Sequence, residues 1–427
     1  MPHTGDPITA LIKHAAHTRF EDIPKPVLAK TIDLLLDTVG CMLAGSSADG
    51  VAELRRTILL WGGNPLARIL SFDIDSSPPQ AAFLNSVMGH ALDFDDTHDA
   101  ALNHGSVTLV PVLLAVCEAL RPGSSAAEDA GLPSRPVTGR EFVAALAVGL
   151  DISNRLGMAF IPYLHVGWLP TTLWGPLACA AACGRLLDLD EAQMSHAFGL
   201  AYSQIHGNRQ ALADGALAKR IQPGFSAAAG LRSAFFAHAG LTGAHSIIGG
   251  AFGIPALYTA GQYDGRHLTD GVGTHYETGN ISIKPYPSCR CSHPVIDAAL
   301  SIREQHKVDW REISEAVIYL PPSSMGQIGN PFVVRDNPTV DAQFSAQYTA
   351  ALAFTEGRPR LAHFQKNYVE SNHALLALAS KFKTVEFEKH LSSLVPIEMH
   401  IKLKGTRTIK LKIEHPKGSL AKPRNRQ

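Results

Sequence analysis

The sequence predicts a mainly α-helical protein, with a large all-helical domain over residues 1–265 and a smaller α+β domain over residues 266–427. The first part is a succession of segments with apolar residues at helical spacing, many of them rich in Ala and Gly. The later part contains short segments in which apolar and polar residues alternate with the period of a strand. The length of 427 residues is sufficient for two domains.

In the first part, residues 26–45 have the apolar spacing of a helix, and Gly45 is expected to end it. Three further segments share many small residues and few charges, namely 139–160, 173–189 and 225–241. A helix that is apolar on all sides is a buried one, so we expect these three to lie enclosed. Residues 121–139 are rich in Pro, Ser and Gly, which predicts an exposed loop.

In the second part, residues 315–322 read as a strand, and residues 397–416 alternate around Gly405 like a hairpin. Helical pieces are expected between them, at 295–306 and 342–354. We expect strands to be confined to this later part of the chain.

The composition limits the classes of function. Because the formal net charge is zero, nothing favours a nucleic-acid partner. The six cysteines are too few for a disulfide framework in a chain of this length, which favours a reducing compartment. The sequence shows neither a secretory leader nor an uninterrupted apolar run of about 20 residues. A cytoplasmic protein without a membrane span is therefore expected.

Residues 92–104, LDFDDTHDAALNH, place four aspartates, one threonine and two histidines between two apolar segments. We expect this stretch to form a helix end and a turn that face the interior. Asp93, Asp95 and Asp96 cannot all be ionised cheaply there, so at least one pKa is raised or cations lie nearby. The alternative is a helix cap with solvated neighbours.

Two lysines, Lys219 and Lys284, each follow a polar turn and precede an apolar helix. A helix N-terminus with a lysine in front of it is a natural anion site. Together with the Asp and His residues of 92–104, the two lysines predict a pocket for a small polycarboxylate with groups that can move protons. The alternative is that either lysine is an ordinary surface residue.

Other chemistries have less support in the sequence. Cys289, Cys291 and His293 could ligate a metal, but no second ligand pair has suitable spacing, so no metal is expected. There is no G-x-S-x-G turn for a serine nucleophile and no glycine-rich phosphate loop after a strand. An aspartate-rich magnesium site for a diphosphate would need a second Asp-rich motif, which is absent.

Five ordered blocks of this sequence resemble the MmgE/PrpD superfamily, which includes 2-methylcitrate dehydratase, cis-aconitate decarboxylase and iminodisuccinate epimerase. The blocks are AAFLNSVMGHALDFDDTHDAALNHGSVTLVP, GWLPTTLWGPLACAAACGRLLDLD, LAKRIQPGFSAAAGLRSAFFAHAGLTG, KPYPSCRCSHPVIDAAL and DAQFSAQYTAALAF. The resemblance extends from near the start of the chain to about residue 416. It implies a large helical domain, a smaller α+β lid domain, a homodimer and chemistry without an organic cofactor.

The resemblance also implies which residues act. The catalytic residues would be His104, Asp93, Lys219, Lys284 and Thr97. We expect Lys219, Lys284 and Thr97 to bind substrate as well, and we add His165 and Arg290 as predicted substrate-binding residues. Two departures from the family pattern stand out: Leu169 replaces a histidine that is common between GW and P-T/S, and Gly105 replaces a proline after His104. His165 could substitute for that missing histidine if both positions lie on one helical face.

We therefore expect a lyase that moves a proton next to a carboxylate of a small di- or tricarboxylate. His104 would carry the proton, because the usual pKa of histidine lies near the working pH. Asp93 would orient or charge His104, Thr97 would bind substrate, and both lysines would hold substrate carboxylates. All five residues are expected to converge on one pocket. An epimerase and an inactive homologue that acts as a binding protein are the alternatives.

Overall fold

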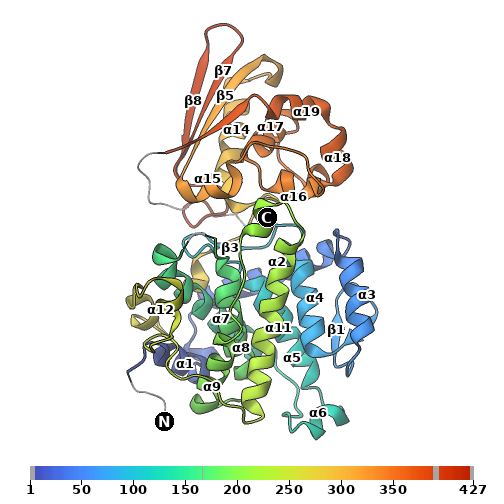
Figure 1. Cartoon of the computed structure of the whole chain (residues 1–427), viewed down its shortest axis with the longest axis vertical. Helices are drawn as coiled ribbons and strands as arrows, with labels where there is room; N and C mark the ends of the chain where they lie inside the picture. Colours follow the sequence, from blue (N-terminus) through green and yellow to red (C-terminus); the bar gives the residue numbers. More distant parts are fainter. Residues whose placement is uncertain (1–4, 166, 388–393, 424–427) are drawn as a thin grey trace. The chain divides into compact units, whose positions relative to one another are not determined.

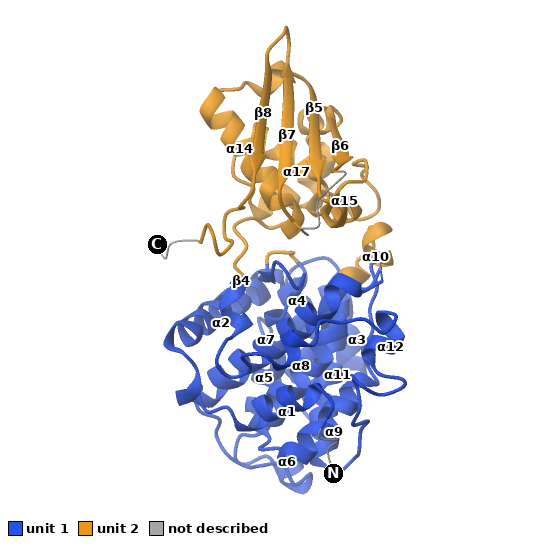
Figure 2. Cartoon of the chain, turned by 90° about the vertical axis from the view of Figure 1, so that its left-hand side faces the viewer, with its two compact units in different colours: residues 1–91, 95–209, 220–281 blue, residues 92–94, 210–219, 282–427 orange. Residues whose placement is uncertain are grey.

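The computed structural model describes residues 5–165, 167–387 and 394–423 (Figure 1). Helices account for 56% of the structure and strands for 9%, so the prediction of a mainly α-helical protein is confirmed. The chain divides into two compact units, which Figure 2 shows in different colours. Unit 1 comprises residues 1–91, 95–209 and 220–281, and unit 2 comprises residues 92–94, 210–219 and 282–427. Two short segments of the first part thus belong to unit 2, and unit 1 extends to Ile281 rather than to residue 265.

Unit 1 is built mainly from helices. They are α1 (Ile8–His17), α2 (Lys25–Gly45), α3 (Val51–Trp61), α4 (Pro78–His90), α5 (Ser106–Ala119), α6 (Ser125–Asp129), α7 (Gly139–Phe160), α8 (Pro170–Leu186), α9 (Glu191–Tyr202), α11 (Ala218–His238), α12 (Ile254–Tyr258) and α13 (Arg266–Thr269). The helices predicted at 26–45 and 139–160 are confirmed by α2 and α7. Helix α11 begins seven residues before the predicted start at residue 225, because the turn that carries Lys219 is itself helical.

The centre of unit 1 is formed by α5, α7 and α8, which pack on one another. Almost every residue of α5 and α8 is buried, as expected from their apolar, Ala-rich sequences. Glycines at the contacts between helices allow neighbouring helices to approach closely. A methyl group at Gly45 on α2 would lie 2.0 Å from the carbonyl oxygen of Met88 on α4. A methyl group at Gly230 on α11 would lie 2.6 Å from the carbonyl oxygen of Pro176 on α8.

The prediction that strands are confined to the later part of the chain was wrong. Strands β1 (Ala67–Ile69) and β2 (Ile74–Ser76) pair antiparallel before α4, and β3 (Thr97–His98) pairs with β4 (Ile281–Ser282). Strand β1 is too short to show a periodic pattern. It is held by a side chain instead, because Asn85 accepts from the Leu70 amide and donates to the Arg68 carbonyl, each at 2.9 Å. The predicted loop at 121–139 likewise contains the short helix α6.

Unit 2 contains a four-stranded sheet in the order β6-β5-β7-β8. The strands are β5 (Ile313–Leu320), β6 (Phe382–Glu386), β7 (Ile397–Leu403) and β8 (Thr408–Ile413). β5 runs parallel to β6 and antiparallel to β7. The predicted strand at 315–322 and the predicted hairpin at 397–416 are confirmed by β5 and by the antiparallel pair β7 and β8.

The helices of unit 2 explain the alternating burial of its strands. They are α10 (Gln210–Ala213), α14 (His293–His306), α15 (Pro322–Ile328), α16 (Pro338–Gln343), α17 (Ala346–Thr355), α18 (Lys366–Ser371) and α19 (His373–Ala379). α14 and α17 contact each other and the sheet, so one face of the sheet is covered (Figure 2). The segment predicted as one helix at 342–354 is broken before Ala346, because Ser345 caps α17 by accepting from the Tyr348 amide.

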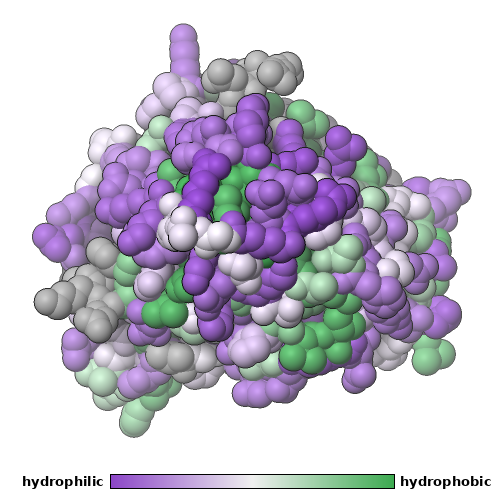
Figure 3. All heavy atoms as spheres, turned by 90° about the horizontal axis from the view of Figure 1, so that it is seen from above, coloured by the Kyte–Doolittle hydropathy of each residue, from purple (hydrophilic) through white to green (hydrophobic). Residues whose placement is uncertain are grey.

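One helical stretch, Gly139–Tyr163, is long and apolar enough to cross a membrane by length and composition alone. Of its most apolar window, 89% is buried inside the protein, which accounts for its composition. The face drawn in Figure 3 is mainly hydrophilic, and its apolar atoms form separate small patches.

Candidate active site

The aspartate-rich stretch lies between α4, which ends at His90, and α5, which begins at Ser106. Asp93, Asp95, Asp96 and Thr97 are all buried. The prediction of a helix end and turn that face the interior is therefore confirmed, and the solvated-cap alternative is not supported.

The three aspartates meet the cost of burial in different ways. Burial, together with the nearby charges of Asp37 and Asp95, raises the pKa of Asp96 to about 8, so this carboxyl is mostly protonated at pH 7. Burial opposes ionisation of Asp95 too, but the charges and hydrogen bonds of His90 and His104 hold its pKa well below the usual range. Asp93 is paired with two lysines. The prediction of one raised pKa and nearby cations is confirmed.

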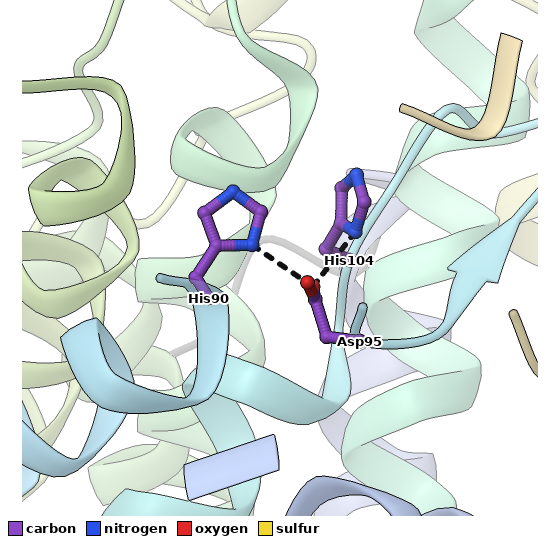
Figure 4. Close-up of side chains that lie close together, drawn as sticks. All are labelled: His90, Asp95 and His104. Atoms are coloured by element: carbon purple, nitrogen blue, oxygen red, sulfur yellow. Dashed lines mark hydrogen bonds and ion pairs between the residues drawn. The ribbon is translucent and has the colours of Figure 1, made fainter. Parts of the chain in front are cut away.

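In unit 1, His90 and His104 share one oxygen of Asp95 (Figure 4). The Nδ1 atoms lie 2.9 Å and 2.8 Å from Asp95 Oδ2, and the ring centroids are 4.9 Å apart in an edge-on arrangement. Since an ionised carboxylate only accepts, each Nδ1 carries the hydrogen that it donates to Asp95. Both Nε2 atoms point away from Asp95 on the same side (Figure 4). We call His90 and His104 the histidine dyad.

His104 is the more accessible member of the dyad. Its side chain is 17% exposed, whereas that of His90 is 1% exposed. The backbone amide of His104 donates to Thr171 Oγ1 at 3.0 Å, and Thr97 Oγ1 lies 3.4 Å from His104 Nδ1. Helix α8 therefore holds the backbone of His104, and strand β3 contacts its imidazole.

The prediction that Asp93 orients His104 was wrong, because the carboxylate that hydrogen-bonds to His104 is that of Asp95. Side chains two residues apart on an irregular segment point in directions that the sequence does not determine. His90 was not predicted as a site residue, although it stands at the C-terminal end of an apolar helix, five residues before Asp95.

In unit 2, Lys219 and Lys284 converge on the carboxylate of Asp93. Lys219 Nζ lies 2.5 Å from Oδ1, and Lys284 Nζ lies 3.1 Å from Oδ2 and 2.8 Å from the carbonyl oxygen of Asp93. Asp93 adopts a φ of 50°, in the left-handed region that Asp tolerates better than most residues. Both lysines are buried, so the surface-residue alternative is excluded. We call Lys219 and Lys284 the lysine pair.

Aromatic and amide groups surround the lysine pair. Lys219 Nζ lies 4.8 Å from the centre of the Phe344 ring. The side-chain amide of Gln343 donates to the Leu92 carbonyl at 2.8 Å and so anchors the segment that carries Asp93. Phe344 also lines a cavity of about 260 Å³ in unit 2, together with Leu212 and Phe332.

Arg290, which was predicted to bind substrate, lies in unit 2 and is buried. Its NH1 donates to the Lys417 carbonyl at 3.0 Å and lies 3.2 Å from His293 Nδ1. Burial and the charges of Arg290 and Lys284 hold the pKa of His293 well below its usual range, so this imidazole is neutral. A hydrogen bond with Cys291 and burial raise the pKa of Cys289, which therefore remains a thiol.

The structure does not support the suggestion that His165 replaces the family histidine missing at Leu169. Helix α7 ends at Phe160, and His165 is exposed in an irregular segment, whereas Leu169 precedes the first residue of α8. The two positions therefore share no helical face. Leu169 is two residues from Thr171, which holds the His104 backbone.

One group of side chains among the described residues could hold a metal ion, namely His90, Asp95 and His104, whose ligand atoms lie within 4.8 Å of one another. Both Nδ1 atoms are at hydrogen-bond distance from a single carboxylate oxygen. Hydrogen bonds from two N–H groups to one carboxylate oxygen therefore account for the arrangement of these three side chains.

The predicted residues thus form two groups. Thr97 and His104 lie together in unit 1, and Asp93, Lys219 and Lys284 lie together in unit 2. The first group contains an imidazole that can carry a proton, and in the second group two ammonium groups pair with one carboxylate. Convergence of all five residues on one pocket stays a prediction.

The chain was compared with known proteins. Residues 9–265 match the MmgE/PrpD N-terminal domain, and residues 286–427 match the MmgE/PrpD C-terminal domain. A cis-aconitate decarboxylase-like protein of Aspergillus oryzae is 27% identical over 401 residues, which cover 90% of this chain and 81% of that protein. Cis-aconitate decarboxylase of Aspergillus terreus is 25% identical, over 84% of this chain and 74% of that enzyme. The human cis-aconitate decarboxylase is 26% identical, over 78% of this chain and 66% of that enzyme. Since the two domain matches span most of its length, the chain belongs to the MmgE/PrpD family.

Proposed function

We propose that this protein is a lyase that acts, without an organic cofactor, on a small di- or tricarboxylate such as cis-aconitate or 2-methylcitrate. Its relatives include proteins named as cis-aconitate decarboxylases, at about 25% identity. The observation that carries the proposal is the lysine pair: two buried ammonium groups share one carboxylate. Ammonium groups at such a site are suited to hold a substrate carboxylate through charge-assisted hydrogen bonds.

The chemistry of such a substrate requires the groups that the chain supplies. Loss of carbon dioxide leaves an electron pair on carbon, which a proton must quench. Loss of water requires removal of a proton next to a carboxylate and protonation of the departing hydroxyl. In both reactions negative charge develops beside the carboxylate, and Lys219 and Lys284 would stabilise it. His104 would carry the proton, and Asp95 would stabilise the imidazolium that forms.

Asp93 and Asp95 are separated by the single residue Phe94. Two residues of chain span at most about 7 Å, which limits the distance between the Cα atoms of Asp93 and Asp95. We propose that both groups serve a single reaction.

The experiment that tests the proposal is incubation of the purified protein with a panel of acids in deuterated water. The panel would hold cis-aconitate, citrate, 2-methylcitrate and aspartate-derived dicarboxylates, and mass spectrometry would report products and deuterium content. We expect loss of carbon dioxide or water from at least one acid, with one deuterium incorporated when carbon is protonated. Absence of any change with every acid would contradict the proposal and favour an inactive homologue that acts as a binding protein.

A second candidate function is epimerisation of a dicarboxylate. The observation that favours it is the presence of two imidazoles on one carboxylate, since an epimerase needs two proton carriers. Deuterium exchange into a substrate that keeps all its carbon and oxygen atoms would distinguish the epimerase from the lyase. In that case replacement of one histidine would abolish epimerisation and retain exchange into one enantiomer.

A further inference from the structure

Unit 2 contains a cavity of about 800 Å³ that the proposed reaction does not use. Four cationic side chains line it, from Arg303, Arg358, Lys417 and Lys422. Among the described residues of the lining, two anionic side chains, from Glu304 and Glu356, offset them, so these residues together carry a net charge of +2. The lysine pair does not belong to this lining.

The two arginines are held in place without being neutralised. Arg303 NH1 donates to the Ala353 carbonyl at 3.2 Å, and Arg358 NH2 donates to the Pro285 carbonyl at 3.3 Å. Within the described parts of the chain, neither guanidinium forms an ion pair with Glu304 or Glu356. A guanidinium has five N–H donors, so each arginine keeps further donors for a ligand while a carbonyl fixes its position.

The rest of the lining sets the size and character of the ligand. Leu300, Pro285 and Pro423 give the cavity an apolar wall, and its volume lies within the range of about 300–1,000 Å³ typical of small-molecule sites. The planar fork of arginine matches the oxygens of both carboxylate and phosphate. We propose that this cavity binds a small organic polyanion, a molecule that carries two or more phosphate or carboxylate groups.

The backbone connects this polyanion site to Lys284. Pro285 and Tyr286, which line the cavity, directly follow Lys284 in the sequence. Gly418 belongs to the same lining, and a methyl group there would lie 2.5 Å from the Ile283 carbonyl oxygen and 3.1 Å from Pro285 Cδ. The residues on both sides of Lys284 are therefore in contact with the lining. A ligand that draws Arg358 and Lys417 together would hold the segment that carries Lys284.

The test is isothermal titration of the full-length protein with two probes, pyrophosphate and citrate, whose comparison separates a phosphate ligand from a carboxylate ligand. We expect at least one probe to bind once per chain at the polyanion site. Arg303→Gln and Arg358→Gln should each weaken that binding about tenfold, the loss expected for a charge-assisted hydrogen bond. Arg407→Gln removes an exposed arginine of unit 2 outside the cavity and serves as the matched control.

A second variant locates the bound probe. Lys219→Ala removes one member of the lysine pair and leaves the cavity intact, so we expect it to retain the binding that the arginine variants lose. Loss of binding in Lys219→Ala with full binding in both arginine variants would assign the probe to the lysine pair and overturn the proposal. Failure of both probes to bind the wild-type protein at millimolar concentration would overturn it as well. Arg303→Lys and Arg358→Lys keep the charge and should restore part of the affinity, which separates loss of the ligand contact from a folding defect.

Discussion

Asp93, Asp95 and Asp96 lie within four residues, and each of their carboxyl groups has a different environment. Asp93 faces two ammonium groups, Asp95 receives two imidazole N–H groups, and the pKa of Asp96 is raised to about 8. Three adjacent charges in a buried turn would be prohibitive. The protonated state of Asp96 removes one of these charges, and the two carboxylates that remain ionised are both paired with cationic or N–H groups.

The raised pKa of Asp96 predicts a pH-dependent stability. Between the usual carboxyl pKa near 4 and the folded value of about 8, the unfolded chain loses a proton that the folded chain retains. Asp96 therefore lowers the free energy of unfolding as the pH rises through this window, by up to about 1.4 kcal/mol per pH unit. Asp96→Asn removes this dependence. We expect its stability relative to the wild type to increase from pH 4 to pH 8 and then to level off.

Urea denaturation at several pH values would measure this effect, with the exposed Asp129→Asn as control. A constant difference between Asp96→Asn and the wild type across the window would show that Asp96 is ionised in the folded protein.

We expect replacement of His104 to change mainly kcat and replacement of Lys284 to change mainly substrate affinity. His104→Ala should reduce kcat by about a hundredfold or more with little change in affinity, because a general acid–base group acts mainly in the transition state. Lys284→Ala should mainly weaken substrate binding, by roughly 1.5–3 kcal/mol for a charge-assisted contact. Steady-state kinetics and equilibrium binding would separate the two effects, with Lys410→Ala as an exposed control. Full activity of His104→Ala would remove the basis for assigning proton transfer to the histidine dyad.

Most residues of the site could be predicted from the sequence, whereas the contacts between their side chains could not. Asp93 is 126 residues from Lys219 and 191 from Lys284, so only the folded chain shows that all three meet. His90 was not predicted, because a single histidine at a helix end is usually structural. His165 was wrongly grouped because helix α7 ends before it, and a sequence resemblance does not locate such an end.

At the scale of elements, the ends of helices were predictable where a residue type marks them. Helix α2 ends at Gly45 as expected, and α7 begins with a capping box in which Thr138 accepts from the Glu141 amide and Glu141 accepts from the Thr138 amide. The hairpin of β1 and β2 was not predictable. Its strands are three residues long, and the Asn85 side chain that holds β1 comes from a different element.

The capping box of α7 predicts a measurable loss of stability. Thr138→Ala removes the acceptor for the Glu141 amide and should lower the free energy of unfolding by about 0.5–2 kcal/mol. Thr138→Ser keeps the hydroxyl and should retain most of the stability. Urea denaturation followed by circular dichroism would measure both variants. Equal stability of the Ala and Ser variants would show that the cap contributes nothing.

At the scale of the whole molecule, unit 2 takes Asp93 and Lys219 from segments that lie far from residues 282–427 in the sequence. A fragment of residues 282–427 would therefore lack the carboxylate with which Lys284 pairs. Removal of one partner from a buried ion pair typically costs about 3–5 kcal/mol. We expect Lys284→Met to stabilise this fragment and Lys410→Met, at an exposed position, to leave its stability unchanged. Thermal melts of the three fragments would test this, and destabilisation by Lys284→Met would contradict it.

The homodimer implied by the family resemblance stays a prediction. Helix α2 exposes three apolar side chains on its surface, those of Ile32, Leu36 and Leu43, which makes it a candidate for the contact between copies. We expect light scattering to report a mass of twice 45.7 kDa, and Leu36→Lys to shift it towards the monomer. A monomeric wild-type protein would contradict the prediction.

The position of His90 in the histidine dyad depends on Gly45, a residue of a different helix. The Cα hydrogen of Gly45 faces the carbonyl of Met88, and His90 follows two residues later at the end of α4. Any side chain at Gly45 would have to displace a backbone, and with it the imidazole that lies 2.9 Å from Asp95. Random mutagenesis screened for loss of activity would therefore recover substitutions at Gly45, although Gly45 has no side chain that could bind substrate or transfer a proton. These substitutions would be classified as folding defects, although they act by displacing the imidazole of His90 from Asp95.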